Sequence, residues 1–444
     1  MKVSIIGGAG YVGLITGLGV ASMGHKVIAV DVDELKVKNL QKGVSPIFED
    51  HLESLLSFSN TNNDISFSNN SSSAIKNSDI IIISVGTPIN AEGKIDLSQV
   101  RSVLKSLVEN IISYSLIVIK STLPITAVKM LKDELNKHHE EGKDFDIVSN
   151  PEFLREGRAI YDFYNPDRIV VGGDSSKSVE VLREFYTPLI ERKLSIPDEI
   201  TIEDKHIPFV KTNLPSAQMI KYGSNAFLAN KISFVNEIAQ ICESVGANVN
   251  EVISGMGLDP RIGNSYMQPG PGFGGPCLEK DLNALVELGR HYDLEATFMN
   301  AILDRNERQV DLLRSKLNNI IHNVSKAQIA ILGLAFKSGT DDTRNSASIK
   351  LIDKLLADGH TVTCYDPVAI YNVHNQNFTQ YSDIYNCLQK ADCMILMTEW
   401  EEFKSLDLKK TFEIMKGDTL LDMRNLFTRD EVESFGFKYV GIGY

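Results

Sequence analysis

The residues best suited to chemistry lie in a glycine-rich stretch, GPGFGGPCLEKD, from Gly270 to Asp281. The stretch holds one cysteine, Cys277, and Lys280 follows three residues later. Glycine lets a backbone turn tightly and approach a ligand closely. A nearby cation favours the thiolate, which is the nucleophilic form of cysteine. The stretch therefore predicts a nucleophilic cysteine. The competing interpretation is a structural cysteine, because free cysteines are often buried in cores.

A second chemical pattern opens the chain. An apolar run, KVSIIG, leads into GGAGYVG, in which Gly8, Gly10 and Gly13 fit the spacing G-x-G-x-x-G. A helical segment and a strand, Lys26–Val30, follow, and the strand ends at Asp31. This order predicts a dinucleotide site, with a pyrophosphate at the helix N-terminus and a ribose hydroxyl on the acid. Asp31 favours NAD over NADP, because a 2′-phosphate would meet its carboxylate.

Polar residues also follow two later apolar runs that are predicted to be parallel strands. Thr87 comes after Asp79–Val85, and Thr122 comes after Leu116–Lys120. Ligands of such sheets gather at the carboxyl ends of the strands, so both threonines are candidate cofactor contacts. Thr122 could equally cap the helix that follows it, and the two roles are compatible.

A carboxylate, Glu152, follows a third predicted strand, Asp146–Ser149. Its neighbours Pro151 and Phe153 are apolar, and apolar surroundings raise the pKa of a carboxyl group. We therefore expect Glu152 to have a raised pKa and to handle protons. The alternative is an acid in a solvated loop.

The sequence predicts one long helix from Pro215 to Val245. Lys221 and Asn225 are four residues apart and share a face of this helix. If that face meets the cysteine stretch, Lys221 supplies a cation and Asn225 a donor at a reacting carbonyl; otherwise the pair is solvated. The residues predicted to form the buried side of the helix are Phe227, Ile232, Phe234, Ile238 and Ile241.

The alternation of strands and helices predicts an α/β protein, and 444 residues are too many for one ordinary core. The first run of alternation ends with a strand in Asn165–Gly173. A long helix from Ala296 to Asn323 precedes the second run, which starts at Lys326. The second run lacks a glycine fingerprint, so we do not expect a second NAD site there. Its cysteines, Cys364, Cys387 and Cys393, are predicted to be core residues.

Composition narrows the class of partner. The net charge of −13 argues against nucleic acid or an anionic membrane. Five cysteines without a C-x-x-C pair support neither a zinc site nor a disulfide framework, which predicts a reducing compartment and no metal. No signal peptide precedes the first strand pattern, and the apolar runs are too short to span a bilayer. We therefore expect a cytoplasmic protein.

Eight motifs occur in the order seen in the UDP-glucose/GDP-mannose dehydrogenase family, and the chain resembles that family over essentially its whole length. They are GGAGYVG, KSTLP, NPEFLREG, NPDRIVVGG, KYGSNAFLANKISFVNE, DPRIGN, GFGGPCLEKD and AFKSGTDDTRNS. The resemblance implies two doubly wound Rossmann-like domains joined by a central helical dimerisation domain. Residues 1–205 would bind NAD, residues 206–305 would carry the cysteine loop, and residues 306–444 would bind UDP. It also implies a UDP-sugar substrate and a homodimer or higher homo-oligomer.

The reaction implied by the resemblance is a four-electron oxidation of a sugar's primary alcohol to a carboxylate, with two NAD per turnover. Cys277 would capture the aldehyde as a thiohemiacetal that is oxidised to a thioester. Lys221 and Asn225 would stabilise the oxyanion, with Lys221 also a candidate base. The residues implied to handle the water and thioester hydrolysis are Glu152, Thr122 and Asp281.

Motif positions imply further contacts. The implied cofactor-binding residues are Gly8, Gly10, Tyr11, Val12, Gly13, Asp31, Thr87, Thr122, Lys280 and Arg344. The implied substrate-binding residues are Phe153, Leu154, Arg155, Glu156, Lys221, Asn225, Arg261, Tyr266, Phe273, Gly274, Phe336 and Lys337. Arg261 resembles the arginine that reaches into the neighbouring subunit's site.

Alternatives to this assignment concern the sugar and the class of protein. The segment Asp259–Asn264 resembles that of the glucose enzymes and favours oxidation of UDP-glucose to UDP-glucuronate. Pro276 and Leu278 depart from the family pattern, so the same chemistry on GDP-mannose or a UDP-N-acetylhexosamine stays open. An inactive NAD-binding scaffold is opposed by the intact set of chemical residues. A two-electron alcohol dehydrogenase would need zinc ligands or a base such as histidine, and none of the nine histidines falls in these motifs.

Overall fold

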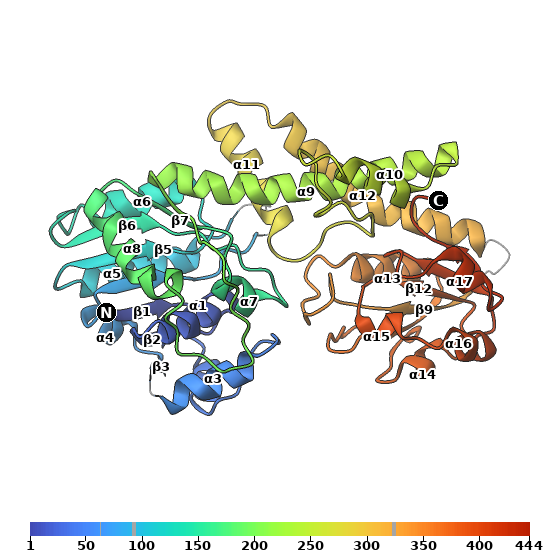
Figure 1. Ribbon diagram of the computed structural model, residues 1–444, viewed down its shortest axis with the longest axis horizontal. Coiled ribbons are helices and arrows are strands. Elements are labelled where there is room, and N and C mark those ends of the chain that lie inside the picture. The colour runs from blue at the N-terminus through green and yellow to red at the C-terminus, as the bar shows by residue number, and fades with distance from the viewer. Residues whose placement is uncertain (63, 91–94, 322–325) are drawn as a thin grey trace. The chain divides into compact units, whose positions relative to one another are not determined.

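The computed structural model describes residues 1–62, 64–90, 95–321 and 326–444. The chain forms two compact units, Met1–Gly223 and Ser224–Tyr444, each built on a largely parallel sheet flanked by helices (Figure 1). The predicted α/β class, with two doubly wound sheets and helices between them in the chain, is confirmed. The division into domains at residues 205 and 305 stays a prediction.

The elements are as follows in chain order. The first unit holds β1 (Lys2–Ile6), α1 (Tyr11–Ser22), β2 (Lys26–Val30), α2 (Glu34–Gln41), α3 (Leu52–Thr61), β3 (Ile65–Ser68), α4 (Ser71–Lys76), β4 (Ile80–Ile83), α5 (Ser98–Asn110), β5 (Ser115–Ile119), α6 (Ile125–Leu135), β6 (Phe145–Ser149), α7 (Ala159–Tyr164), β7 (Ile169–Gly173), α8 (Ser176–Ile190) and β8 (Phe209–Thr212). Helix α9 (Leu214–Val245) runs through the division between the units. The second unit continues with α10 (Val249–Gly257), α11 (Leu278–His291), α12 (Thr297–Ile320), β9 (Gln328–Leu332), α13 (Ala347–Ala357), β10 (Thr361–Tyr365), β11 (Phe378–Gln380), α14 (Ile384–Leu388), β12 (Cys393–Leu396), α15 (Glu401–Lys404), α16 (Leu408–Ile414), β13 (Thr419–Asp422), α17 (Arg429–Glu433) and β14 (Lys438–Val440).

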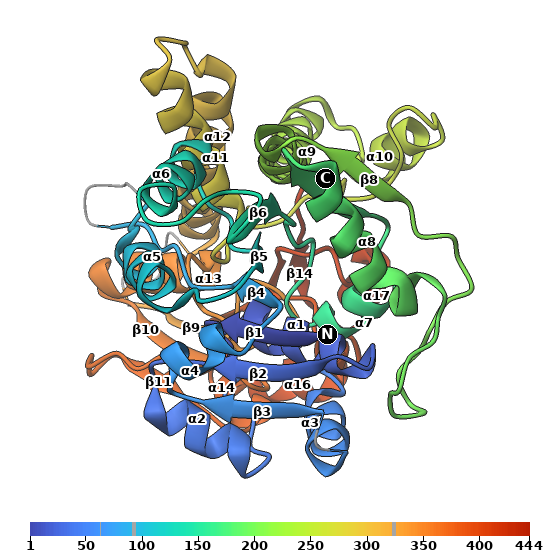
Figure 2. The ribbon, with the colours of Figure 1, turned by 90° about the vertical axis from the view of Figure 1, so that its left-hand side faces the viewer.

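The sheet of the first unit has the strand order β3-β2-β1-β4-β5-β6-β7-β8. Every neighbouring pair is parallel except β6 and β7. The strands from β3 to β6 can be followed from bottom to top in Figure 2. The order reverses between β1 and β4, and ligands of such sheets bind at this point, beyond the carboxyl ends of the strands.

Two apolar layers cover this sheet because its central strands are hydrophobic on both faces. On strand β4, Ile80 and Ile82 pack into a cluster with α1, α3, α7 and α8. Ile81 and Ile83 pack into a second cluster with α4, α5 and α6. The alternation of side chains along a strand therefore divides one uninterrupted apolar run between two cores.

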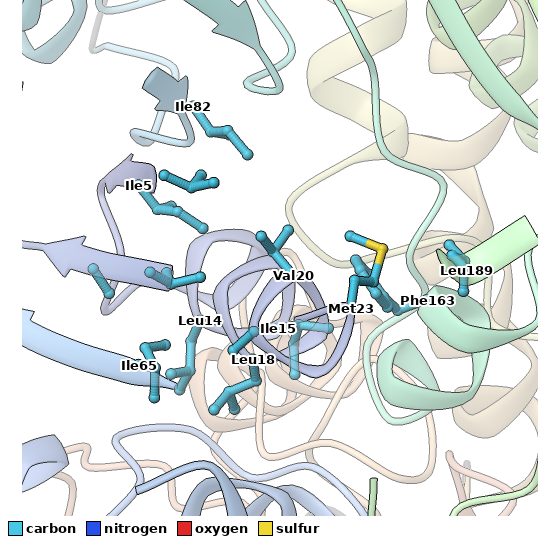
Figure 3. Packing of buried hydrophobic residues seen from close by; sticks show 14 of the residues in the cluster. Ile5, Leu14, Ile15, Leu18, Val20, Met23, Ile65, Ile82, Phe163 and Leu189 are labelled. Atoms are coloured by element: carbon cyan, nitrogen blue, oxygen red, sulfur yellow. The ribbon is translucent and has the colours of Figure 1, made fainter. Parts of the chain in front are cut away.

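Helix α1 is buried on nearly all sides, and its glycines allow that. Leu14 and Leu18 lie beside Ile65 in Figure 3, while the end of the helix approaches Phe163. A Cβ added at Gly19 would lie 2.1 Å from the Phe163 ring. The missing side chain is what lets α7 pack closely against this helix.

The second unit repeats the doubly wound plan with an all-parallel sheet of order β11-β10-β9-β12-β13-β14. One face packs against α9, α10, α12 and α13, and the other against α14, α15, α16 and α17. Cys364, Cys387 and Cys393 are fully buried in these two layers, so their predicted packing role is confirmed.

The long helix predicted from Pro215 to Val245 is confirmed as α9, but the predicted buried side is wrong in part. Phe227, Phe234 and Ile241 are 61%, 45% and 52% exposed. From Ala226 onward, the apolar residues that α9 buries are small or slender: Ala226, Ala229, Val235, Ala239 and Cys242. These small side chains let the neighbouring elements pack close to this part of the helix. No helix among the described residues is long and apolar enough to cross a membrane.

The Ser- and Asn-rich segment Phe58–Asp79 contains the end of α3, the strand β3 and the helix α4. Asn70 caps α4 by accepting from the Ser73 N–H, so a Ser- and Asn-rich segment forms a helix. The predicted helix from Ala296 is α12, and its predicted end at Asn323 lies outside the described residues.

Gly13 provides a test of this packing. A Cβ at Gly13 would lie 2.1 Å from the Gly7 carbonyl oxygen, whereas a Cβ at Gly10 would lie 3.4 Å from it. We expect Gly13→Ala to destabilise the chain by about 1–3 kcal/mol, because α1 must move away from β1. Gly10→Ala should cost less, about 0.5–1 kcal/mol, since it only worsens the N-cap.

The measurement is the first thermal unfolding transition of each variant without cofactor. Equal transition temperatures for the two variants, or a stabilised Gly13→Ala, would contradict the packing argument. Alanine is otherwise the better helix former by about 1 kcal/mol, so a loss at Gly13 can only come from the close approach.

Candidate active site

The glycine-rich turn after β1 has the features of a pyrophosphate site. Gly7 and Gly8 both donate backbone N–H groups to the Val30 carbonyl, which holds the turn against the end of β2. A Cβ at Gly8 would lie 2.7 Å from that of Ala29, so only glycine fits. Gly10 is the N-cap of α1 and offers no side-chain cap, which leaves the start of the helix for an anion.

Asp31 lies where the predicted ribose contact requires it. One carboxylate oxygen accepts from the Ala9 N–H of the glycine turn at 3.1 Å, and the other accepts from the Asp33 N–H at 3.1 Å. The carboxylate is therefore fixed beside the turn with lone pairs left for hydroxyl groups. The turn, the uncapped helix and this acid fit NAD, and they would hold its pyrophosphate and adenosine ribose.

The two threonines at strand ends lie together. The Thr87 hydroxyl donates to the Thr122 carbonyl at 3.2 Å, and Ser121 donates to the Val85 carbonyl at 2.7 Å. These bonds join the segments that follow β4 and β5. Thr122 precedes α6, whose N-cap is Pro124, so its predicted capping role is wrong.

Glu152 forms a buried ion pair with Lys221. Its Oε1 lies 2.9 Å from the Lys221 Nζ, and its other oxygen accepts from the Leu154 N–H at 2.6 Å. The expectation of a raised pKa for Glu152 is wrong. Burial alone would raise it, but the Lys221 ammonium, the Leu154 N–H and the Lys120 charge together hold the pKa of Glu152 below its usual range. Glu152 is thus an ionised carboxylate, suited to accept a proton or orient a water molecule.

Lys120 belongs to the same buried cluster and was not singled out from the sequence. Its Nζ donates to the Asn150 side-chain oxygen at 3.1 Å and more weakly to the Tyr186 hydroxyl at 3.4 Å. Burial lowers the pKa of Lys120 to about 8, against the attraction of Glu152. The only hint in the sequence was its place at the end of a strand, where an apolar run becomes polar.

Cys277 differs from the other four cysteines because it alone is exposed. It is the N-cap of α11 and has helix, not strand, directly after it. A helix N-terminus favours negative charge and therefore the thiolate. The sequence pointed to Lys280 as the nearby cation, whereas the structure adds the start of the helix itself.

Amide side chains of two helices hold the loop that carries Cys277. Asn306 on α12 accepts from the Phe273 N–H at 2.8 Å and donates to the Phe273 carbonyl at 3.0 Å. Asn236 on α9 and Gln309 on α12 bond the N–H and the carbonyl of Gly270. Sequence reasoning missed all three amides, because they lie 30 or more residues from the loop.

Asn225 and the first turn of α11 form a second polar group. The Asn225 amide donates to one oxygen of Asp281 at 2.6 Å, and Lys280 donates to the other at 2.7 Å. Asp281 is 1% exposed, so its carboxylate depends on these donors. The Asp281 N–H also bonds the Cys277 carbonyl, which ties this group to the cysteine.

The predicted substrate residues after Glu152 are held by other charges. Arg155 makes a two-bond contact with Asp162, at 2.9 and 2.6 Å. The Phe153 ring lies 3.7 Å from the Arg168 guanidinium and 5.4 Å from the Lys221 Nζ. Phe153 therefore lies beside the buried pair of Lys221 and Glu152.

The hydroxyl of Tyr11, whose contact with the cofactor stays a prediction, donates to a buried acid, Glu49. Glu49 also accepts from the N–H groups of Gly157 and Ala159 at 2.8 and 2.6 Å. Burial raises the pKa of Glu49, despite these donors. Glu49 thus joins the start of α1 to the segment that follows Glu156, and no motif in the sequence indicated this contact.

The remaining predicted residues of the second unit lie in loops. Arg261 is highly exposed and pairs with Asp259, two residues earlier, and Arg344 pairs in the same way with Asp342. Gly275 bonds the Arg344 carbonyl through its N–H, which places the cysteine loop against that segment. The other predicted positions are Tyr266, which has a positive φ of 61°, Gly274, which packs against Phe336, and Lys337, whose ammonium lies 5.6 Å from the Phe336 ring.

The structure thus gathers the predicted residues into two groups. Glu152 and Lys221 lie together in the first unit, and Cys277, Asn225, Lys280 and Asp281 lie together in the second. Lys221 and Asn225 are one turn apart on α9. The chemistry available is that of a thiol nucleophile, two oxyanion donors and two carboxylates.

Three family models match the chain. The NAD binding domain of the UDP-glucose/GDP-mannose dehydrogenase family matches residues 1–190, its central domain matches residues 215–308, and its UDP binding domain matches residues 330–429. These matches agree with the NAD site built from the glycine turn and Asp31.

Relatives that match this chain over its whole length are named as dehydrogenases of the same kind of substrate. The chain is 39% identical to UDP-glucose 6-dehydrogenase TuaD of Bacillus subtilis, over all of this chain and 93% of that protein. It is 37% identical to UDP-glucose 6-dehydrogenase of Rickettsia bellii, over all of this chain and 99% of that protein. The structure of a UDP-glucose dehydrogenase from Pyrobaculum islandicum superposes with a TM-score of 0.88 at 30% identity, covering 100% and 98% of the two chains. That of a UDP-D-ManNAc dehydrogenase from Pyrococcus horikoshii gives 0.85 at 27% identity, covering 100% and 99%.

Asp31 generates a prediction about the cofactor. Asp31→Ser removes the carboxylate that would repel a 2′-phosphate, so we expect the preference for NAD over NADP to narrow by about tenfold or more, which corresponds to about 1.4 kcal/mol. The measurement is kcat/KM with each cofactor.

A neighbouring acid provides the control. Asp33 caps α2 by accepting from the Leu35 and Lys36 N–H groups. Asp33→Ser should therefore leave the cofactor preference unchanged. A wild type that prefers NADP, or an equal shift in both variants, would refute the role of Asp31.

Proposed function

The chain belongs to the UDP-glucose/GDP-mannose dehydrogenase family, and we propose that it oxidises UDP-glucose to UDP-glucuronate through a covalent intermediate on Cys277. It is an NAD-dependent nucleotide-sugar dehydrogenase. The observation that carries the covalent mechanism is the position of Cys277, exposed at the N-terminus of α11 beside the Asn225–Asp281 bond.

UDP-glucose is favoured over other nucleotide sugars by the relatives. The two relatives at 39% and 37% identity are named UDP-glucose 6-dehydrogenases, and the UDP-D-ManNAc enzyme is less similar at 27%. The segment Asp259–Asn264 resembles that of the glucose enzymes and supports the same choice. GDP-mannose and UDP-N-acetylhexosamines are the alternative substrates.

The first step forms an aldehyde at C6 of the sugar. NAD, when bound, takes up one hydride from this carbon in each of two oxidations. Lys221 accepts the hydroxyl proton as general base, and the adjacent Glu152 carboxylate stabilises the ammonium that results. The buried pair therefore allows a proton to move without leaving an isolated charge.

The second step joins the aldehyde to the enzyme. The Cys277 sulfur attacks the aldehyde carbon and forms a C–S bond, while the carbonyl oxygen becomes an oxyanion. Lys221 and Asn225 donate hydrogen bonds to that oxygen. Collapse of the oxyanion returns its electron pair to the carbon and expels the second hydride, which leaves a thioester.

Water completes the reaction. A water molecule held by Thr122, Glu152 and Asp281 attacks the thioester carbon and loses a proton to a carboxylate. The C–S bond breaks, the thiolate of Cys277 leaves, and the product is a sugar carboxylate. The acid ionises to a carboxylate, which a thiolate does not readily attack, so the hydrolysis resists reversal.

We also propose that the enzyme works as a homodimer or higher homo-oligomer. The exposed Phe227, Phe234 and Ile241 are spaced by seven residues and so line one face of α9. A row of exposed large apolar side chains is typical of a protein interface. The exposed Arg261 would then reach a partner's substrate, and the mass of the protein in solution is the measurement that decides the assembly.

The substrate is tested with a panel of nucleotide sugars. We expect the highest kcat/KM with UDP-glucose, and two NADH formed for each sugar consumed, because the aldehyde stays bound until it is oxidised. A higher value for GDP-mannose or UDP-N-acetylglucosamine would reassign the substrate. One NADH per sugar would indicate that the protein is a two-electron alcohol dehydrogenase.

Cys277 is tested by substitution. Cys277→Ala should abolish formation of the sugar acid while NAD still binds, and Cys277→Ser should turn over extremely slowly, because serine is a poorer nucleophile and leaving group. Cys242→Ala is the matched control, since Cys242 is buried in the core around α9.

The control should keep sugar-acid formation near that of the wild type. NADH release and product mass report the result. A Cys277→Ala enzyme that still makes the acid at close to the wild-type rate would show that the cysteine is structural and that the covalent mechanism is wrong.

A further inference from the structure

Lys120 is a fully buried lysine that the proposed mechanism does not use. It follows β5 and is 5% exposed. Among the described residues its ammonium is hydrogen-bonded only to neutral oxygens, those of Asn150 and the Tyr186 hydroxyl. Burying a charge without an ion-pair partner is costly unless a nearby charge compensates it. The free-energy cost of burying the Lys120 ammonium raises the question of what its charge does in the site.

The charged groups around Lys120 come from two other elements. Glu152, in the segment after β6, attracts it, and Lys221, on α9, repels it. Tyr186, on α8, is neutral because burial raises its pKa. Glu152 and Lys221 are themselves paired at 2.9 Å. Lys120, Lys221 and Glu152 together have two ammonium groups and one carboxylate, so these three residues carry one positive charge in excess.

We propose that Lys120 is a positioning residue whose charge lets Lys221 release its proton. With Lys120 present, loss of the Lys221 proton leaves a buried carboxylate and a buried ammonium, which balance. Without Lys120, the same loss leaves Glu152 as an isolated buried charge. The charge of Lys120 therefore favours neutral Lys221, which is the form that can accept a proton from the sugar hydroxyl. The inference rests on the proposed function for the role of Lys221 as base.

Most of the local bonds remain when the charge is removed, and the group that loses a donor is the Asn150 carbonyl, which accepts from Lys120 at 3.5 Å. The Asn150 side-chain oxygen also accepts from the Tyr186 hydroxyl at 2.6 Å, and the Asn150 amide donates to the Val170 carbonyl at 2.9 Å. Both bonds persist in Lys120→Met. Glu152 likewise keeps its bonds to Lys221 and to the Leu154 N–H.

The first experiment is the pH dependence of kcat with UDP-glucose and NAD. In Lys120→Met we expect the acid limb of the kcat–pH profile to move to higher pH by about one unit or more. At a pH below that limb, kcat should then be about tenfold lower than in the wild type. The KM for UDP-glucose should change by less than about threefold, since Lys120 acts through Lys221. Because the pKa of Lys120 is about 8, its charge is present below that pH and the difference between the enzymes should shrink above it.

A matched variant separates charge from packing. Tyr186→Phe removes one neutral acceptor of Lys120 and keeps its charge, so its acid limb should stay where it is in the wild type. Lys120→Gln, which is neutral and polar, repeats the test if methionine is not tolerated. A lowered kcat with an unshifted limb in the Lys120 variants would show a structural role and overturn the proposal.

The second experiment needs no substrate. Thermal unfolding of Lys120→Met, Glu152→Gln and the double variant forms a cycle. Lys120→Met should lower the unfolding temperature more when residue 152 is glutamate than when it is glutamine, because only the carboxylate attracts Lys120. An additive cycle would overturn the proposal. If the wild type fails to oxidise UDP-glucose while the cycle is non-additive, the proposed substrate is wrong and the coupling of Lys120 to Glu152 is supported.

Discussion

The buried ion pair between Lys221 and Glu152 is the interaction on which the arrangement of the first unit's active group depends. Removing two charges from water costs several kcal/mol for each ion, and their attraction offsets this only with good geometry and with the remaining polar atoms bonded. Here the distance is 2.9 Å, and the second carboxylate oxygen accepts from the Leu154 N–H. One turn earlier on α9, Gln218 donates to the Leu123 carbonyl at 3.1 Å. The helix start is thereby held where its lysine can reach the carboxylate.

The six strands of the second sheet follow the same order as the first six strands of the first sheet. The acid that follows the second strand makes different bonds in the two sheets. Asp31 accepts two backbone N–H groups among the described residues, so its carboxylate keeps acceptor sites for ribose hydroxyls. Asp366, at the corresponding place after β10, accepts four, including those of Leu334 and Ala335. A carboxylate with four backbone donors has an essentially structural role. This difference gives a physical reason to expect a ribose contact at Asp31 and not at Asp366.

Neutral amides, rather than charges, fix the cysteine loop. Asn236, Asn306 and Gln309 bond the backbone of the loop, and Asp281, near Cys277, is bonded to Lys280 and Asn225. Amide groups hold the backbone without adding a net charge beside the thiol. The start of α11 adds a partial positive charge at Cys277, which favours the thiolate.

The sequence by itself determined the features that depend on neighbours in the chain. The glycine turn with Asp31, the strand Lys26–Val30, the helix from Pro215 and the family motifs all follow from local pattern, because strand and helix periodicity and turn chemistry act over a few residues. The tertiary structure alone decided which side of α9 is buried, and it exposed Phe227 and Phe234 where periodicity predicted a core. It also reversed the expected pKa shift of Glu152 and brought Lys120 into the site. Glu152 and Lys221 are 69 residues apart, and Lys120 and Asn150 are 30 apart. Electrostatic environment is set by groups that meet only after folding, so no local pattern could have predicted either result.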